Sequence, residues 1–214
     1  MALTLTPVLG GREVMLRPLT QDDVAALALA AGESREHFGF SMVPDGPVEM
    51  GRYVEKLLRQ HRQGNRLPFA TVWRGRIVGC TSFIEPRVWE WPHDSDLQRV
   101  DRPDAVEIGS TWLAASAQRT CCNTEAKLLM LSHAFDCWEV HAVSFKTDAR
   151  NDRSRRAIER LGACFEGIRR ADMLGSDGTI RNSAYYSIIA AEWPAIKERL
   201  EQALRQCQIR QYRA

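Results

Sequence analysis

A polar turn at residues 118–124 leads into a run with helical spacing, residues 123–138. The first N–H groups of a helix have no partner inside it, and the helix dipole makes that end partly positive. The turn contains no proline, so each residue offers an N–H, and Arg119 and Lys127 would add charge. The pattern predicts an anion site suited to phosphate. A plain helix cap at Asn123, with no ligand, explains the same residues and stays open as an alternative.

A second group of candidate phosphate ligands follows in the chain. Five arginines lie at and on the next predicted helix, residues 151–161: Arg150, Arg153, Arg155, Arg156 and Arg160. Arginine binds phosphate oxygens through two parallel hydrogen bonds. We expect Arg155 or Arg150 to contact phosphate and the others to form a solvated helix face.

Alternating strand and helix patterns must position these residues. Strands are predicted at residues 14–19, 68–73, 77–84, 106–113, 140–147, 164–174 and 180–190, and helices at 20–32, 47–63, 123–138, 151–161 and from Trp193 onward. Gly75 supplies the turn of one hairpin and residues 176–179 that of another. Residues 85–104 form a long irregular loop. No linker divides the chain, so we expect one α/β (α+β) domain over residues 10–200, with residues 201–214 as a helical extension.

The overall composition excludes several classes of protein. Of 214 residues, 44% are hydrophobic and 26% charged, which is typical of a globular domain and not of a disordered or fibrous chain. The net charge of +2 provides no strong field, so we expect no nucleic acid and no membrane as partner, although the arginine cluster keeps nucleic acid as a minor alternative. No apolar run could span a membrane, and residues 1–19 lack a leader pattern, which favours a cytoplasmic protein.

The six cysteines show no spacing typical of a metal site. His133 and Cys137 are four residues apart on a predicted helix, but two ligands are too few for a metal. We therefore expect no metal, and free, mostly buried thiols.

Two segments carry a resemblance to a known family. Residues 107–113 followed by residues 118–126 resemble the acetyl-CoA-binding core of the GCN5-related N-acetyltransferase (GNAT) superfamily. The likeness extends through residues 146–154 and 161–167. It is strongest to the ribosomal-protein N-acetyltransferase (RimJ/RimL-like) type, which opens with a strand like residues 14–19 and closes with one like residues 184–188.

The resemblance implies a fold and a cofactor site. The fold is a mixed, mostly antiparallel sheet with two central parallel strands, here residues 106–113 and 140–147, that splay apart between flanking helices. Acetyl-CoA is the co-substrate: its pantetheine arm binds near Leu113 and its pyrophosphate on the turn. The residues implied to bind it are Trp112, Leu113, Gln118, Arg119, Thr120, Cys121, Cys122, Asn123, Thr124, Asn151, Ser154 and Arg155.

Cys121 and Asn123 stand where the family pattern has glycine. Glycine permits a positive φ and a close approach to phosphate, whereas cysteine adopts such a backbone poorly. We expect the cofactor to bind through the N–H groups with reduced affinity. The departure also favours an alternative, a non-catalytic or regulatory CoA-binding module. A helix N-terminus would lower the pKa of a reactive thiol at Cys121 or Cys122.

Acetyl transfer to an amine, which the resemblance implies, requires a base and a proton for the thiolate. Glu107 is the predicted base, because partial burial between Val106 and Ile108 would raise its pKa. Pairing with an arginine is the alternative role for this carboxylate. Tyr185 or Tyr186 is the predicted acid, and only one can reach the thiol because neighbouring strand residues point to opposite faces.

The acceptor stays open between a protein N-terminus and a small-molecule amine, and so does a homodimer. A protein acceptor predicts an open groove, acidic if a basic ribosomal tail enters it. A small amine predicts a closed pocket with the loop containing Trp89 and Trp91 as its lid.

Overall fold

The computed structural model of the chain describes residues 6–97 and 101–213. Residues 1–5 of the N-terminal segment, residues 98–100 of the predicted 85–104 loop, and Ala214 at the end of the predicted extension lie outside it. No helix of the described part is long and apolar enough to cross a membrane.

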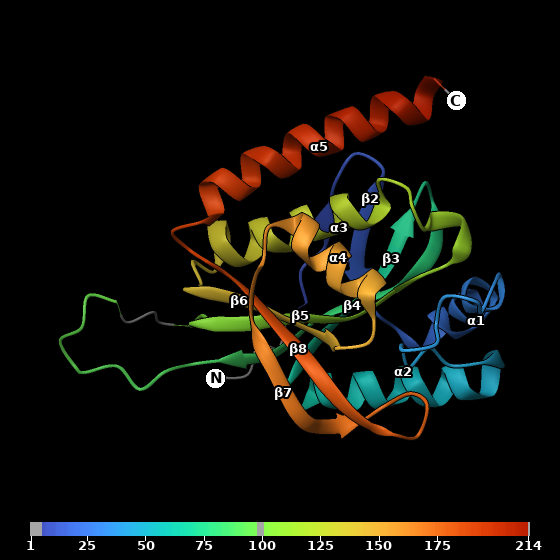
Figure 1. Ribbon diagram of the computed structural model, residues 1–214, viewed down its shortest axis with the longest axis horizontal. Coiled ribbons are helices and arrows are strands. Elements are labelled where there is room, and N and C mark those ends of the chain that lie inside the picture. Colours follow the sequence, from blue (N-terminus) through green and yellow to red (C-terminus); the bar gives the residue numbers. More distant parts are fainter. Residues whose placement is uncertain (1–5, 98–100, 214) are drawn as a thin grey trace.

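One mixed sheet forms the centre of the described chain (Figure 1). Its strands are β1 (Leu9–Gly10), β2 (Val14–Pro18), β3 (Arg66–Trp73), β4 (Arg76–Arg87), β5 (Ala105–Leu113), β6 (Ala142–Asp148), β7 (Cys164–Leu174) and β8 (Ile180–Ile189). Their order is β1-β2-β3-β4-β5-β6-β8-β7, and among these strands only β5 and β6 pair in parallel. The predicted α/β class and mostly antiparallel sheet are confirmed.

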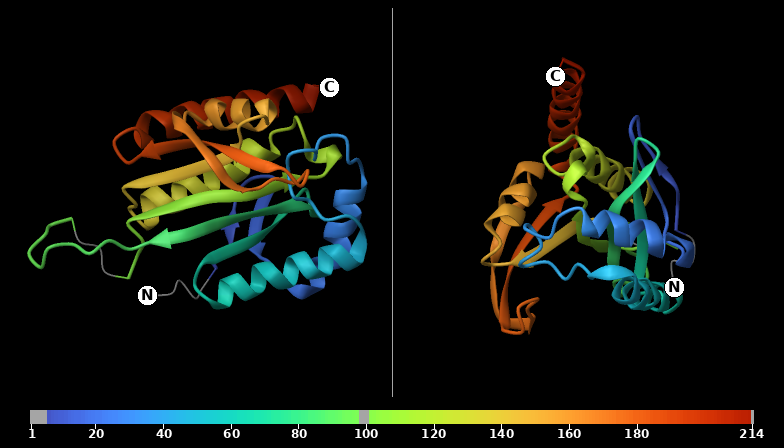
Figure 2. Two further views of the ribbon diagram at one scale, coloured as in Figure 1. Left: turned by 60° about the horizontal axis from the view of Figure 1, so that its bottom comes forward. Right: turned by 90° about the vertical axis from the view of Figure 1, so that its right-hand side faces the viewer.

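Helices cover both faces of the sheet. They are α1 (Val24–Gly32), α2 (Gly46–Arg62), α3 (Cys122–Ser132), α4 (Asp152–Leu161) and α5 (Trp193–Arg213), with a π-helical segment (His133–Cys137) continuing α3. Figure 2 shows α3, α4 and α5 on one face and α1 with α2 on the other. The helix α5 runs across α3, so the C-terminal part of the chain returns toward the beginning of that helix.

Local turn chemistry explains most of these boundaries. Gly75 has φ 78° in the tight β3–β4 turn, and Gly162 ends α4 with φ 98°, a backbone that side chains rarely adopt. Asn151 caps α4, because its side chain accepts the N–H of Ser154 at 3.0 Å. β1 is a strand that the sequence patterns missed, and it is only two residues long.

The irregular loop is shorter than predicted, because β4 continues to Arg87. Asp104 is fully buried at its base, where its carboxylate accepts the N–H of Trp89 and Nε1–H of Trp91, both at 2.7 Å. Trp89 also stacks on His141 with 5.4 Å between ring centres. The described residues of the loop on either side of 98–100 project away from the body of the protein (Figure 1).

The cysteines differ from the prediction of free thiols. Cys121, at the start of α3, forms a disulfide with Cys207 of α5, 86 positions later. The prediction is wrong for this pair because the return of α5 over α3 brings the two residues together. Of the remaining four, Cys80 and Cys122 are buried thiols and Cys137 and Cys164 are exposed.

We expect the oxidised protein to expose four titratable thiols after unfolding and the reduced protein six. Opening the disulfide by Cys207→Ser should lower the free energy of unfolding by about 3 kcal/mol, since a cross-link of this span restricts the unfolded chain. Urea unfolding of the oxidised proteins measures the difference. Cys137→Ser, at an exposed free cysteine, should leave stability nearly unchanged. Six thiols in protein isolated without reductant would contradict the pairing.

Candidate functional site

The two central parallel strands separate after a short paired section. β5 and β6 pair only at Ala105–Ala142, Val106–Val143 and Glu107–Ser144, although β5 continues to Leu113 and β6 to Asp148. Their second halves therefore diverge, as the resemblance implied. A bulge at Ser110, which has φ 49°, interrupts the pairing of β5 with β4 at the same level.

The backbone of Leu113 faces the gap between these strands. Ala114 N–H donates to Val78 O of β4 at 2.7 Å, and successive residues in an antiparallel pair direct their polar groups alternately toward and away from the partner strand. Leu113 therefore directs its N–H and C=O away from β4. Gln118 Nε2 donates to that C=O at 2.7 Å, which leaves the N–H of Leu113 as a donor toward the gap.

The turn before α3 leaves backbone N–H groups at the start of the helix, where we expect an anion. α3 begins at Cys122, whose N–H donates to Thr120 Oγ1 at 3.1 Å. The N–H groups of the next residues in the first turn have no acceptor within the helix. Cys121 has φ −70°, and the positive φ of the turn falls on Arg119 at 60°. Residues 121 and 123 thus require no left-handed backbone here, which removes the conformational part of the reason for expecting reduced affinity.

The cysteine side chains at this turn are not reactive thiols in the structure. Cys121 forms the disulfide with Cys207 and has no free thiol. Burial raises the pKa of the Cys122 thiol to about 12. The expectation of a lowered thiol pKa is wrong, because burial outweighs the helix terminus. Lys127, which we expected to add charge to the turn, is instead buried between α3 and the sheet. Its Nζ donates to Thr81 Oγ1 at 2.9 Å and to Thr111 Oγ1 at 2.7 Å.

Two arginines flank the turn. Arg153 Nη2 of α4 donates to Gln118 Oε1 at 2.6 Å, so Gln118 connects the end of β5 with α4 across the gap. Burial and the nearby charge of Arg119 lower the pKa of Arg153. Two guanidinium groups that repel each other next to free helix N–H groups form a site that an anion would stabilise.

The arginines that we expected on phosphate have partners within the protein. Arg150 pairs with Asp148 at 2.7 Å and with Asp177 at 2.8 Å. Arg155 Nε donates to the hydroxyl of Tyr186 at 2.9 Å. Of these three arginines, Arg153 is the one with a hydrogen bond to the turn among the described residues, through Gln118. The sequence offered no signal to distinguish them, since all five lie on one charged segment.

The other predicted cofactor residues fall into two groups. Thr124 and Asn123 lie in the first turn of α3, and Ser154 lies in the first turn of α4 above its cap, Asn151. Trp112 is different: it is 5% exposed and packs edge-to-face on Phe38, on the face covered by α1 and α2. The structure places this side chain in the core and not in the gap.

Glu107 lies at the last paired position before the gap opens. Its side chain is largely buried, and Lys146 Nζ of β6 is 3.2 Å from Oε2. Burial raises the pKa of Glu107, and the positive charges of Lys146 and Arg66 oppose that increase. A side chain at position 109 would contact the carboxylate, with a Cβ only 3.0 Å from Oε1, so Gly109 keeps the space beside Glu107 open.

The two tyrosines point to opposite faces, as strand geometry predicts. Tyr186 is fully buried under α4, and its hydroxyl donates to Glu159 Oε1 at 3.1 Å. Tyr185 pairs with Lys146 in the sheet and lies on the same face as Glu107. Its hydroxyl accepts from Arg169 at 3.1 Å and donates to Asp172 at 3.2 Å. The structure brings Tyr185, and not Tyr186, to the side of Glu107.

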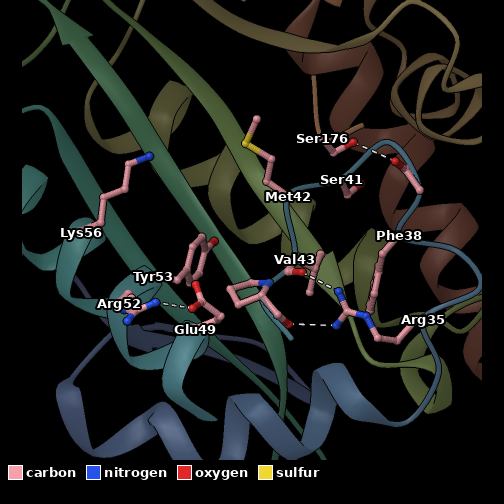
Figure 3. Close-up of a pocket in the computed structure, with 12 residues that line it drawn as sticks. Arg35, Phe38, Ser41, Met42, Val43, Glu49, Arg52, Tyr53, Lys56 and Ser176 are labelled. Atoms are coloured by element: carbon pink, nitrogen blue, oxygen red, sulfur yellow. Dashed lines mark hydrogen bonds and ion pairs between the residues drawn. The ribbon is translucent and has the colours of Figure 1, made fainter. Parts of the chain in front are cut away.

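A pocket of about 490 Å³ opens on this same face (Figure 3). Its walls come from the segment between α1 and α2, from α2 between Glu49 and Lys56, and from Ser176 in the β7–β8 turn. Phe38 of the segment packs on Trp112 of β5, and Ser176 Oγ donates to Gly39 O at 2.8 Å. The segment thus spans from the β5 side of the gap to the β8 side, and the pocket lies between this segment and α2.

Sequence reasoning missed this pocket, because its walls come from a segment without regular structure that only tertiary packing places over the gap. None of the described residues of the loop containing Trp89 and Trp91 lines it. The structure therefore does not support this loop as a lid.

Comparison with known proteins identifies the family. The sequence model of a protein family, the acetyltransferase (GNAT) domain, matches residues 13–163, which are more than two thirds of the chain. The chain belongs to this family. The GNAT resemblance inferred from the sequence is confirmed, and the protein is an acetyltransferase enzyme.

Individual proteins named as acetyltransferases are also similar to this chain. A curated Bacillus subtilis (strain 168) protein named as a candidate ribosomal N-acetyltransferase, YdaF, is 25% identical over 189 residues, which cover 86% of this chain and 95% of that protein. An acetyltransferase structure from T. thermophilus is 31% identical and covers 94% of this chain and 98% of its own, with a TM-score of 0.75. Mycobacterium smegmatis RimJ, solved with a CoA-disulfide, shares the fold at 23% identity, with 95% and 97% coverage and a TM-score of 0.73.

Proposed function

We propose that this GNAT enzyme transfers the acetyl group of acetyl-CoA to the N-terminal amine of a protein or peptide by direct attack of the amine on the thioester. The observation that carries the proposal is the gap between β5 and β6, with a desolvated carboxylate at one end and an anion site at the other. The YdaF match, a protein named for ribosomal N-acetylation, supports a protein acceptor over a small-molecule amine.

The residues of the turn fit the phosphates of coenzyme A. The first-turn N–H groups of α3, Arg119 and Arg153 would hold the pyrophosphate, and Leu113 would bind the pantetheine arm through its backbone. The N–H of Leu113 also suits an oxyanion that develops at the thioester.

Glu107 supplies the base in this proposal. An amine must lose its proton before it attacks, and a carboxylate with a raised pKa accepts that proton at neutral pH. As the C–N bond forms and the C–S bond breaks, the leaving thiolate takes a proton from a neighbouring donor. Tyr185 is the preferred donor, because it lies on the face of Glu107 whereas Tyr186 is fully buried under α4.

The non-catalytic alternative rested on the replaced glycines. Since Cys121 has an ordinary helical φ, the backbone conformation at this position gives no reason to prefer that alternative.

The test is direct. We expect purified protein, acetyl-CoA and a peptide with a free N-terminus to release CoA and to yield peptide heavier by one acetyl group in equal amounts. The same peptide with a blocked N-terminus is the control and should give neither product. CoA release without acetylated peptide, or no release with any amine, would contradict the proposal.

Arg153→Gln should weaken CoA binding about tenfold, because a hydrogen-bonded charge next to the pyrophosphate is removed. Calorimetric titration of CoA measures the loss, and dephospho-CoA should show the same loss. Arg156→Gln, on an exposed part of α4, is the matched control and should bind normally. A loss that disappears with dephospho-CoA would instead place Arg153 on the 3′-phosphate.

A further inference from the structure

The pocket between α2 and the segment that precedes it has more cationic than anionic side chains in its lining. Its lining includes Arg35, Arg52 and Lys56 but a single carboxylate, Glu49, which pairs with Arg52. Arg35 donates to two main-chain oxygens of its own segment at 2.7 and 2.9 Å and pairs with Asp45 at 3.7 Å, so the excess positive charge of the lining comes from Lys56. Lys56 has no carboxylate within ion-pair distance among the described residues. The one carboxylate of the lining, Glu49, is already paired, so the pocket offers a basic peptide tail no free carboxylate.

A second unpaired cation lies between the pocket and the base. Arg66, at the start of β3, donates from Nε to Gln60 Oε1 at 2.8 Å and from Nη1 to Ser110 Oγ at 2.9 Å. Both partners are neutral, and no carboxylate of the described chain forms an ion pair with Arg66. Burial makes this uncompensated charge costly and lowers its pKa, with Glu107 and Glu85 acting only from a longer distance.

These cations form a continuous track toward the reacting centre. Lys56 and Gln60 are four residues apart on α2 and therefore share one face of the helix. Gln60 holds Arg66, and Arg66 reaches Ser110 at the bulge of β5, three residues after Glu107. If the amine of an acceptor lies next to Glu107, the groups that follow it in the acceptor would lie near Arg66, and groups further along would lie near Lys56.

We propose that the acceptor is a peptide N-terminus with acidic side chains among its first few residues, whose carboxylates bind Arg66 and Lys56 while the amine lies at Glu107. This inference rests on the proposed function and specifies its substrate class. It replaces the expectation of an acidic groove for a basic tail. The pocket volume of about 490 Å³ suits several residues of peptide and exceeds what one free amino acid fills.

The experiment compares acceptor peptides that differ only at residues 2–4, which are acidic, uncharged amide or basic. We expect kcat/KM for CoA release to be at least about tenfold higher for the acidic peptide than for the uncharged one, and lowest for the basic one. The preference should shrink as salt is added, since the contacts are between charges at a partly exposed site. Free aspartate and glutamate should be acetylated much more slowly than the acidic peptide.

Variants connect the preference to the two cations. Arg66→Met and Lys56→Glu should each reduce the ratio of acidic to uncharged peptide several-fold, mainly through KM, and Lys56→Glu should improve the basic peptide. Arg62→Met, at an exposed position of α2 outside the track, is the matched control and should keep the wild-type ratio. Because Lys56 is exposed, its variant tests the idea even if Arg66→Met folds poorly.

The outcomes separate this inference from the proposed function. Equal rates for the three peptides, or a preference for the basic one, would overturn the acidic acceptor while leaving peptide acetylation intact. Free aspartate reacting as fast as the acidic peptide would overturn the peptide assignment. Failure to acetylate any peptide or amine would remove the proposed function itself.

Discussion

Glu107→Gln should reduce kcat about 100- to 1,000-fold while CoA binding stays unchanged, because the amide cannot accept the proton of the attacking amine. Glutamine fills nearly the same volume, and CoA is expected to bind at the turn before α3, at the far end of β5. Steady-state rates with a peptide acceptor and calorimetry with CoA measure the two quantities separately.

The pH dependence gives the base assignment a second test. Glu107 acts as a base only when it is ionised, so kcat/KM should fall as pH decreases through its pKa, which burial raises above the ordinary 4.5. Lys146 stabilises the ionised form, and Lys146→Met should therefore move the acidic limb of the profile to higher pH. The limb should be absent from whatever activity Glu107→Gln retains.

A neighbouring carboxylate provides the control. Glu85 of β4 is exposed and has only a long-range effect on Glu107, so Glu85→Gln should keep kcat within about threefold of wild type. If Glu107→Gln turns over at the wild-type rate from acid to alkaline pH, the base is a different group. The carboxylate would then serve only to hold Lys146 beside the opening of the gap.

Much of the fold was predictable because local signals determine it. Gly75 and Gly162 mark a turn and a helix end through backbones that glycine adopts easily, and both appear where expected. The order of a strand at 106–113, a polar turn and a helix after it was also predicted correctly. The separation of β5 and β6 came only from the family resemblance, since no local pattern encodes where two parallel strands stop pairing.

The site was less predictable because long-range packing decides it. The disulfide between Cys121 and Cys207 depends on the path of α5, and the pocket depends on where the segment between α1 and α2 crosses the gap. Arg153 differs from its neighbouring arginines only by its place on α4 relative to Gln118. Sequence spacing could identify such residues as candidates but could not show which of them lie at the site.

Lys127 is expected to make stability depend on pH in a way that a neutral replacement abolishes. Its ammonium group is buried among Thr81, Thr111 and Met130 with no carboxylate partner among the described residues, and burial lowers its pKa from 10.5 to about 7. In the unfolded chain the pKa returns to its ordinary value. Between these two values the unfolded state binds a proton that the folded state does not, so stability rises with pH across this window.

The predicted comparison is between wild type and Lys127→Met. Methionine keeps most of the packing, and the hydroxyls of Thr81 and Thr111, 2.8 Å apart, can satisfy each other. At or below pH 7 the variant should be more stable by about 1–4 kcal/mol, because the cost of burying the charge is removed. That advantage should shrink by roughly 3 kcal/mol between pH 7 and about pH 9.5.

Urea unfolding at a series of pH values measures the effect as a difference between the two proteins, so that other titrating groups cancel. The nearby thiols do not interfere, since burial raises the pKa of Cys80 to about 11 and that of Cys122 to about 12. Lys197→Met, at a surface pair with Asp136, is the control and should show a difference that hardly changes with pH. A constant difference between wild type and Lys127→Met across this range would mean that the lysine keeps its proton in the fold, with water or an anion reaching it beneath the sheet.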